Sequence, residues 1–125
     1  MRRTQVAGSR QARLVLTSYV RALTIPPVDV IRSLHGITFI WDARKANANI
    51  TKHGVAFADA CEVFADPLLQ SQPSQVRDGE VRETVIGLTS TWQLLFVAYV
   101  TGEEALRVIS ARPASPQERR FYENC

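Results

Sequence analysis

The chain has 125 residues and a mass of 14.0 kDa, which is enough for one domain but not for two. Apolar residues make up 46% of it and charged residues 22%, a globular composition that excludes a mostly disordered chain. The net charge is +3, but residues 1–36 carry six arginines and one aspartate, whereas residues 37–125 are slightly acidic. The high pI therefore does not by itself indicate a nucleic-acid-binding surface in the larger part.

Two cysteines, Cys61 and Cys125, form no disulfide framework, and neither has a second cysteine or a histidine at a metal-ligand spacing. This pattern predicts a reducing compartment, no metal site and no cofactor. The longest apolar run, residues 94–99, is far too short to span a bilayer, which needs about 20 residues. We therefore expect a cytoplasmic protein that does not associate with membranes.

Residues 1–36 form a basic N-terminal extension that differs from the rest of the chain. Four apolar residues between positions 16 and 23 have helical spacing, and Pro26 ends the pattern. Three explanations stay open: translated upstream sequence with the true start between residues 28 and 34, a flexible arm, or a targeting peptide. Residues 37–125 are predicted to form the folded domain.

The domain is expected to open with a strand over residues 37–41, which are apolar and β-branched. Asp42 then suits the N-cap of a helix that runs to Lys52, and His53-Gly54 ends this helix. A second helix is expected over residues 56–65, because four apolar residues repeat at helical spacing. These residues are Phe57, Ala60, Cys61 and Phe64.

The second half of the chain predicts mainly strands. Residues 70–81 are polar and indicate a loop or a weak edge strand, and strands follow over residues 82–88, 93–100 and 106–111. Ser115, Pro116 and Glu118 form a capping box with proline at the first helical position, which predicts a short C-terminal helix. The order of elements favours an α+β fold, with an antiparallel sheet, helices N-terminal to it and a short C-terminal helix.

No phosphate-binding glycine loop, nucleophile elbow or paired-histidine motif is present. His53 can act as a general acid or base near neutral pH, but spacing alone favours a helix C-terminal residue that interacts with the last carbonyl groups. Lys45, Asn49 and Lys52 share one helix face, which either grips phosphates or is simply solvated.

Arginines on the last strands are the other candidates for chemistry. Arg107 and Arg112 are five residues apart, and side chains an odd number of residues apart lie on different faces of a regular strand. The two arginines therefore share a site only if the chain bends near residues 111–113. The alternative for Arg112 is an ion pair with Glu118. Glu80 and Arg82 share a face, and a cross-strand ion pair is their simpler explanation.

These residues together resemble the BrnT toxin family. The resemblance begins with Trp41-Asp42-x-x-Lys45-x-x-x-Asn49-x-x-Lys52-His53-Gly54-Val55-x-Phe57 and Val63-Phe64-x-Asp66-Pro67. It continues with Glu80-x-Arg82, Ile86-Gly87, Val97-x-Tyr99, Arg107-x-Ile109-Ser110-Ala111-Arg112 and Glu118-Arg119-x-x-Tyr122. The motifs cover residues 37–124 in the family's order, whereas residues 1–36 have no counterpart.

The resemblance implies a RelE-like fold and a ribonuclease toxin of a type II toxin–antitoxin module that inhibits translation. It also implies a BrnA-type antitoxin that neutralises the toxin, and contact with operator DNA only through the antitoxin complex. The slightly acidic charge of residues 37–125 agrees with a domain that does not bind duplex DNA itself.

With no metal site expected, RNA cleavage would use the ribose 2′-hydroxyl as nucleophile, with arginines stabilising charge on the phosphate. The expected catalytic residues are His53, Arg82, Arg107 and Arg112, with Lys52 or Glu80 in reserve for proton transfer. The expected RNA-binding residues are Lys45, Lys52, Tyr99 and Arg119, with Tyr122 as a second stacking candidate. The competing hypothesis is a catalytically inactive co-repressor that only binds the antitoxin.

Overall fold

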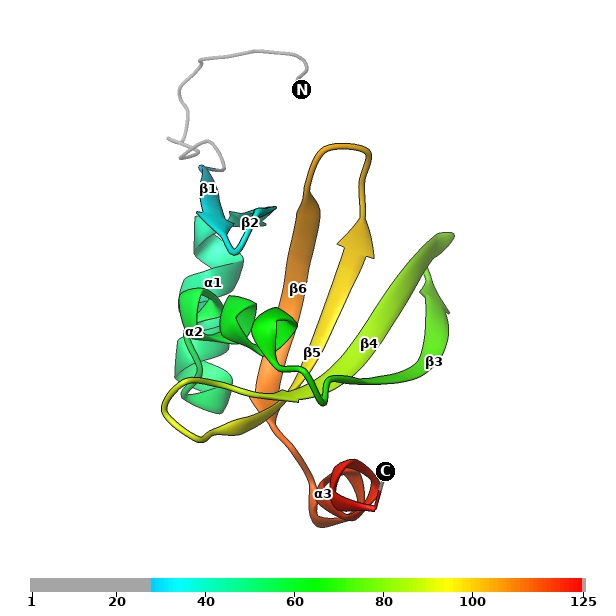
Figure 1. Ribbon diagram of the computed structural model, residues 1–125. Helices are drawn as coiled ribbons and strands as arrows, with labels where there is room; N and C mark the ends of the chain where they lie inside the picture. Colours follow the sequence, from blue (N-terminus) through cyan, green and yellow to red (C-terminus); the bar gives the residue numbers. More distant parts are fainter. Residues whose placement is uncertain (1–27, 125) are drawn as a thin grey trace, which may run out of the picture.

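A computed structural model describes residues 28–124, and the helix pattern at residues 16–23 lies outside this range. The described chain forms a mixed six-stranded sheet with strand order β1-β2-β6-β5-β4-β3, together with three α-helices (Figure 1). The elements are β1 (Asp29–Leu34), β2 (Ile37–Asp42), α1 (Ala43–His53), α2 (Phe57–Ala60), the 3₁₀ helix η1 (Cys61–Ala65), β3 (Gln70–Arg77), β4 (Glu80–Leu88), β5 (Leu94–Thr101), β6 (Leu106–Pro113) and α3 (Pro116–Glu123). The α+β class predicted from the sequence is confirmed.

The direction of one strand pair corrects the expected antiparallel sheet. Four of the five pairings are antiparallel, but β2 and β6 run parallel, with Phe39 opposite Leu106 and Ile40 opposite Arg107. Parallel neighbours require a crossover connection, and here the whole chain between β2 and β6 provides it. Apolar patterning shows that a segment is a strand but not which way its neighbour runs. The first two helices also follow two strands rather than precede the sheet.

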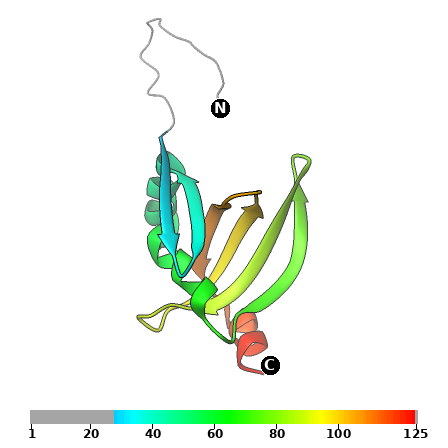
Figure 2. The same ribbon diagram turned by 45° about the horizontal axis from the view of Figure 1, so that its top comes forward.

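Strand β1 lies in the segment that sequence reasoning assigned to the extension. It pairs antiparallel with β2 along its whole length, and Val30 and Leu34 pack against the core. His35 and Gly36 form the two-residue turn, with φ angles of 53° and 80°. Positive φ at both turn positions matches the right-handed twist of a tight hairpin. Figure 2 shows this hairpin at one side of the sheet and β3 at the other.

The hydrophobic core lies between one face of the sheet and the α2–η1 segment (Figure 1). Trp41 meets Phe57 edge-on with ring centroids 6.0 Å apart, and Phe64 lies 5.3 Å from Phe39. Phe57, Ala60 and Cys61 are buried, which confirms the stripe expected over residues 56–65. Within residues 28–124, no helix is long and apolar enough to cross a membrane.

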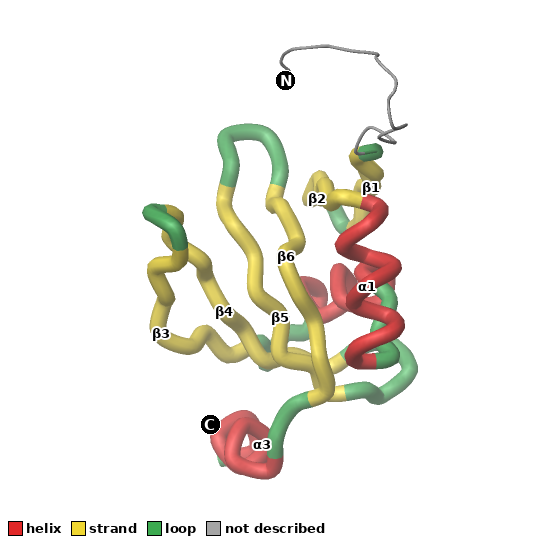
Figure 3. Tube along the Cα trace, turned by 180° about the vertical axis from the view of Figure 1, so that it is seen from behind, coloured by secondary structure: helices red, strands yellow, loops and turns green. Residues whose placement is uncertain are grey.

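Helix α1 begins and ends as its sequence predicts. The Asp42 side chain accepts a hydrogen bond from the backbone N–H of Arg44, and Gly54 ends the helix in the left-handed conformation, with φ of 72°. Lysine and histidine in the last turn suit the negative end of the helix dipole. The helix lies alongside β6 and the β1–β2 hairpin (Figure 3).

Asn49 attaches α1 to the edge of β6, although its spacing with two lysines suggested a solvated face. Strand β2 pairs with β6 only at residues 106 and 107, so the later part of that edge lacks a strand partner. The Asn49 side-chain amide donates to the carbonyls of Ala111, at 2.8 Å, and Val55, at 2.9 Å. Its carbonyl oxygen accepts from the Ala111 N–H at 3.2 Å. One side chain thus takes the place of a missing strand.

Asn49→Ala should lower the free energy of unfolding by about 3 kcal/mol, because it leaves buried backbone groups of Ala111 and Val55 without partners. Urea unfolding followed by circular dichroism measures the change. Asn47→Ala, two residues away on an exposed position of the same helix, is the matched control and should stay within about 0.5 kcal/mol of the parent. Equal stabilities of the two variants would contradict this role for Asn49.

Candidate functional site

A β-bulge in β6 places Arg107 and Arg112 on the same face of the sheet. Phe96 is paired with Arg112 and Ala98 with Ser110, but Tyr99 is paired with Val108 and Val100 with Arg107. Residue 109 is therefore extra, and it reverses the alternation of the strand at that point. Paired residues project to the same side of a sheet, so both arginines lie on the side of Phe96, Ala98 and Val100. The expected bend at residues 111–113 is not what joins them.

Arg82 belongs to the same face. Thr84 is paired with Ala98, and Arg82 precedes Thr84 by two residues. This face is the one opposite the hydrophobic core, and it holds a cleft of about 510 Å³. The lining comprises Gln72, Pro73, Ser74, Gln75, Arg77, Arg82, Thr84, Phe96, Ala98, Ser110, Arg112 and Glu118. Three arginines against a single carboxylate make this cleft suited to an anion.

Arg112 is held at the edge of the cleft by an ion pair with Glu118. Its Nη1 and Nη2 atoms each lie 2.8 Å from one oxygen of the Glu118 carboxylate, and its guanidinium carbon lies 4.3 Å from the centre of the Phe96 ring. The ion pair that the sequence offered as the alternative for Arg112 is therefore present. The Arg112 hydrogen bonds hold the pKa of Glu118 below its usual value, and the Ser115 N–H adds to this effect despite partial burial.

Arg82 has an unsatisfied donor. Its Nε is buried and has no hydrogen-bond acceptor among residues 28–124, and a carboxylate oxygen of Glu80 lies 3.9 Å away. The ion pair expected from the sequence thus forms within β4 rather than across strands. A buried donor without an acceptor costs free energy, and this cost is relieved if a ligand oxygen reaches it.

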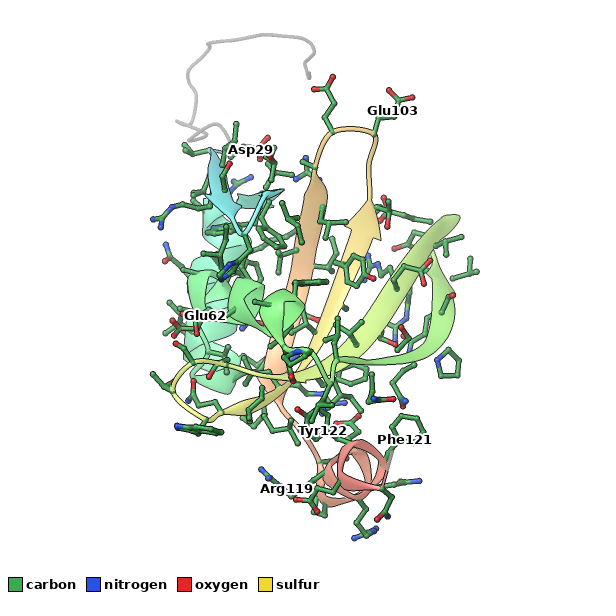
Figure 4. All side chains as sticks on the ribbon, viewed as in Figure 1. Asp29, Glu62, Glu103, Arg119, Phe121 and Tyr122 are labelled. Atoms are coloured by element: carbon green, nitrogen blue, oxygen red, sulfur yellow. The ribbon has the colours of Figure 1, made fainter. Side chains whose placement is uncertain are left out.

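Arg107 shares the face but does not line the cleft. Its Nη1 lies 3.8 Å from a carboxylate oxygen of Asp29 in β1, and both side chains are nearly half exposed. Figure 4 places Asp29 at the end of the sheet far from α3, where Tyr122, Phe121 and Arg119 lie. Arg107 therefore extends the positive face away from Arg112 and toward the β1–β2 hairpin.

Four of the other residues expected at the site lie elsewhere. His53, Lys45 and Lys52 are on α1, and none of them lines the cleft. Arg119 is an exposed residue of α3, 3.9 Å from Glu123. The positions of the three α1 residues follow from α1 packing on the edge of β6 instead of over the cleft face.

The two tyrosines considered for base stacking also point away from the cleft. Tyr99 is on the core face, where its ring meets Phe64 edge-on at 5.1 Å. The Tyr122 hydroxyl donates to an Asp66 carboxylate oxygen at 2.6 Å. Burial and this Asp66 contact raise the pKa of Tyr122 to about 12, so its proton stays in place at neutral pH.

Sequence reasoning missed two residues that shape the cleft. Arg77 is in the polar strand β3, and it lines the cleft because β3 pairs with β4 beside Arg82. Phe96 is in β5, whose apolar sequence predicted burial on both faces, yet the Phe96 ring forms part of the cleft wall. The alternation of side chains along β5 could have indicated this position, because Phe96 and Ala98 flank the core residue Val97 and therefore lie on the opposite face of the strand.

Comparison with known proteins places these features in one family. The family described as "Ribonuclease toxin, BrnT, of type II toxin-antitoxin system" matches residues 41–118. The crystal structure of the Brucella abortus ribonuclease toxin BrnT is 36% identical in sequence, with a TM-score of 0.49, and the match covers 60% of this chain and 92% of that one. No curated protein sequence gives a significant match.

Glu118→Gln should flatten the pH dependence of stability in the acid range. Because the pKa of Glu118 is lowered in the folded state, its ion pair stabilises the fold above the unfolded pKa of about 4.5 and is lost as the pH falls through the lower folded value. Urea unfolding between about pH 3 and pH 6 should therefore give a shallower slope for the variant than for the parent. Glu123→Gln, on the same helix and solvent-exposed, should follow the parent curve. If the unfolding free energy of the Glu118→Gln variant changed with pH as steeply as that of the parent, the stabilising role of the ion pair would be contradicted.

Proposed function

Because the chain belongs to the BrnT family of ribonuclease toxins of type II toxin–antitoxin systems, we propose that it is a metal-independent endoribonuclease that inhibits translation in the cytoplasm. The family match spans most of the domain and supports RNA cleavage as the activity. The RelE-like character of the fold is part of the same proposal.

The observation that carries the proposal is the arginine-lined cleft on the face of the sheet opposite the hydrophobic core. Arg82 and Arg112 lie on the two strands that flank β5 and both line the cleft, with Arg112 opposite Phe96 and Arg82 at the level of Val100. Strands β4 and β6 are about 10 Å apart, and the four-residue offset adds about 13 Å along the strands, so the two long side chains meet one phosphodiester by extending toward each other along the cleft.

In the proposed reaction the ribose 2′-hydroxyl attacks phosphorus, the bond to the 5′-oxygen breaks, and a 2′,3′-cyclic phosphate forms. Arg82 and Arg112 stabilise the negative charge that develops on the non-bridging oxygens. Arg77 and Arg107 hold neighbouring phosphates along the same face. Polar groups of Gln72, Thr84 and Ser110 are available in the cleft for base or sugar contacts.

Proton transfer is assigned by position on the sheet. Glu80 lies on the same face of β4 as Arg82, beside the cleft rather than in its lining, and its carboxylate is 3.9 Å from the Arg82 Nε, so we propose that it takes the 2′-hydroxyl proton. Water in the open cleft supplies a proton to the leaving 5′-oxygen. His53 remains the histidine candidate from the sequence, and its place in the last turn of α1, the helix that packs on the edge of β6, weighs against it.

An antitoxin partner follows from the type II family, and we propose that it is BrnA-like and neutralises the enzyme. Operator DNA would be contacted through the antitoxin, which agrees with the slightly acidic charge of residues 37–125. An inactive co-repressor would bind the same antitoxin and cleave nothing, so RNA cleavage separates the two functions.

Arg112→Ala should lower the rate of RNA cleavage by about 10²-fold, because it removes a preorganised charge at the phosphate. The assay is the initial rate of loss of intact cellular RNA in EDTA, with folding checked by circular dichroism. Arg44→Ala, which removes an exposed arginine of α1, is the matched control and should keep the parent rate. A correctly folded Arg112 variant with an unchanged rate would remove Arg112 from the site.

Glu80→Gln should lower kcat by about 10²-fold or more, because it removes the proposed general base. His53→Gln should keep the rate within about threefold, since this residue lies at the end of α1, whereas Glu80 lies 3.9 Å from the cleft residue Arg82. Steady-state kinetics in EDTA on one RNA preparation compares the two variants. The reverse result, with loss only in the His53 variant, would assign proton transfer to His53 instead.

A further inference from the structure

The guanidinium of Arg112 has five N–H donors, and the structure shows which of them are used. One hydrogen of Nη1 and one of Nη2 bind the two Glu118 oxygens, both at 2.8 Å. The other Nη1 hydrogen meets the carbonyl of Pro113 at 3.2 Å. Among residues 28–124, no hydrogen bond of Nε or of the second Nη2 hydrogen is found. These two donors are adjacent and form one complete edge of the guanidinium plane.

Glu118 is itself fixed where it meets Arg112. Its backbone N–H binds the Ser115 hydroxyl, and one of its carboxylate oxygens accepts the Ser115 N–H at 2.8 Å. This capping box ties the carboxylate to the first turn of α3, and only 16% of the Glu118 side chain is exposed. Phe96 covers one face of the same guanidinium. The guanidinium is thus held on one edge and one face.

We propose that Glu118 is a positioning residue that binds one edge of the Arg112 guanidinium and so directs the neighbouring, unused edge toward a substrate phosphodiester. The inference rests on the proposed function for the identity of the substrate. A parallel pair of N–H donors matches two phosphate oxygens, so the unused edge is suited to bidentate binding. The ion pair therefore does not occupy the phosphate-binding edge but orients it.

Orientation matters because arginine has a flexible stem that must be ordered before it can act. A carboxylate that already holds the guanidinium in place lowers the conformational entropy that is lost during binding and catalysis. Glutamine at position 118 has a similar shape but only one acceptor oxygen, and its NH₂ group opposes an arginine donor. Glu118→Gln therefore removes the bidentate orientation while leaving the Arg112 charge in the cleft.

The first test is binding, which does not depend on cleavage. The full-length ¹⁵N-labelled chain is titrated with a 20-nucleotide 2′-O-methyl RNA of mixed sequence, and the Arg112 Nε–H resonance is followed by NMR. Its assignment comes from its absence in Arg112→Lys. In the parent the resonance should shift on titration. In Glu118→Gln the shift should be lost or need about 10-fold more RNA.

Glu123→Gln, the same change at an exposed position of α3, is the matched control for this titration. It keeps the capping box and the Arg112–Glu118 pair, so it should bind like the parent. Three results would each overturn the inference: a parent response in Glu118→Gln, an equal loss in Glu123→Gln, or an unmoved Arg112 resonance in the parent.

The second test uses cleavage in a double-mutant cycle. Glu118→Gln should lower kcat/KM by about 10- to 100-fold in the parent and by less than about twofold in the Arg112→Ala background. Equal losses in both backgrounds would show that Glu118 acts independently of Arg112 and would overturn the inference. If the parent cleaves no RNA, the proposed function fails, and the NMR titration still decides the role of Glu118.

Discussion

The side-chain amide of Asn49 is the interaction on which the rest of the structure depends. It binds both backbone groups of Ala111 and the carbonyl of Val55, so it joins α1, the chain after α1 and the edge of β6 that β2 does not cover. Strand β2 diverges from β6 after two paired residues, and a buried strand edge without partners is unfavourable. Asn49 makes this divergence possible. Ala111 also directly precedes Arg112, so the same bonds fix the backbone from which that arginine extends.

The bulge in β6 brings Arg107 onto the same face of the sheet as Arg112. Without residue 109 as an extra residue, Arg107 would lie on the core face, where a charge without a partner is costly. With it, Val108 and Ala111 both remain in the core while Arg107 and Arg112 lie on the other face. Bulges commonly redirect side chains near functional sites, and this one separates the apolar and the charged sides of a single strand.

The two faces of the sheet therefore have different roles. The α2–η1 segment covers one face, where Phe39 and Phe57 are buried and Phe64 is partly buried. The opposite face keeps Arg82 and Arg112 in an open cleft that α3 borders through Glu118. Helix α3 also binds Asp66 through Tyr122, so this short helix is anchored to both the cleft and the η1 side of the molecule. That anchoring gives the Glu118 carboxylate a fixed position.

Local patterns in the sequence determined most of the elements. Capping residues such as Asp42 and Ser115 define helix ends through contacts only two or three residues away, and alternating apolar residues define strands, so both could be predicted. Strand β1 escaped prediction because its polar residues mask the alternation, although His35-Gly36 marks a turn. The family motifs likewise identified Arg82 and Arg112, without showing whether they share a site.

Only the tertiary structure decided which candidates meet. The parallel pairing of β2 with β6, the burial of Asn49 and the separation of Tyr99 from the cleft all depend on contacts between residues far apart in the chain. A one-residue bulge reverses every side chain that follows it, and no local pattern in β6 indicates its position. The sequence alone therefore determined most of the elements, the family and the charged residues. The register between β5 and β6 decided which of those charges face one another, because side-chain direction in a strand changes with every residue.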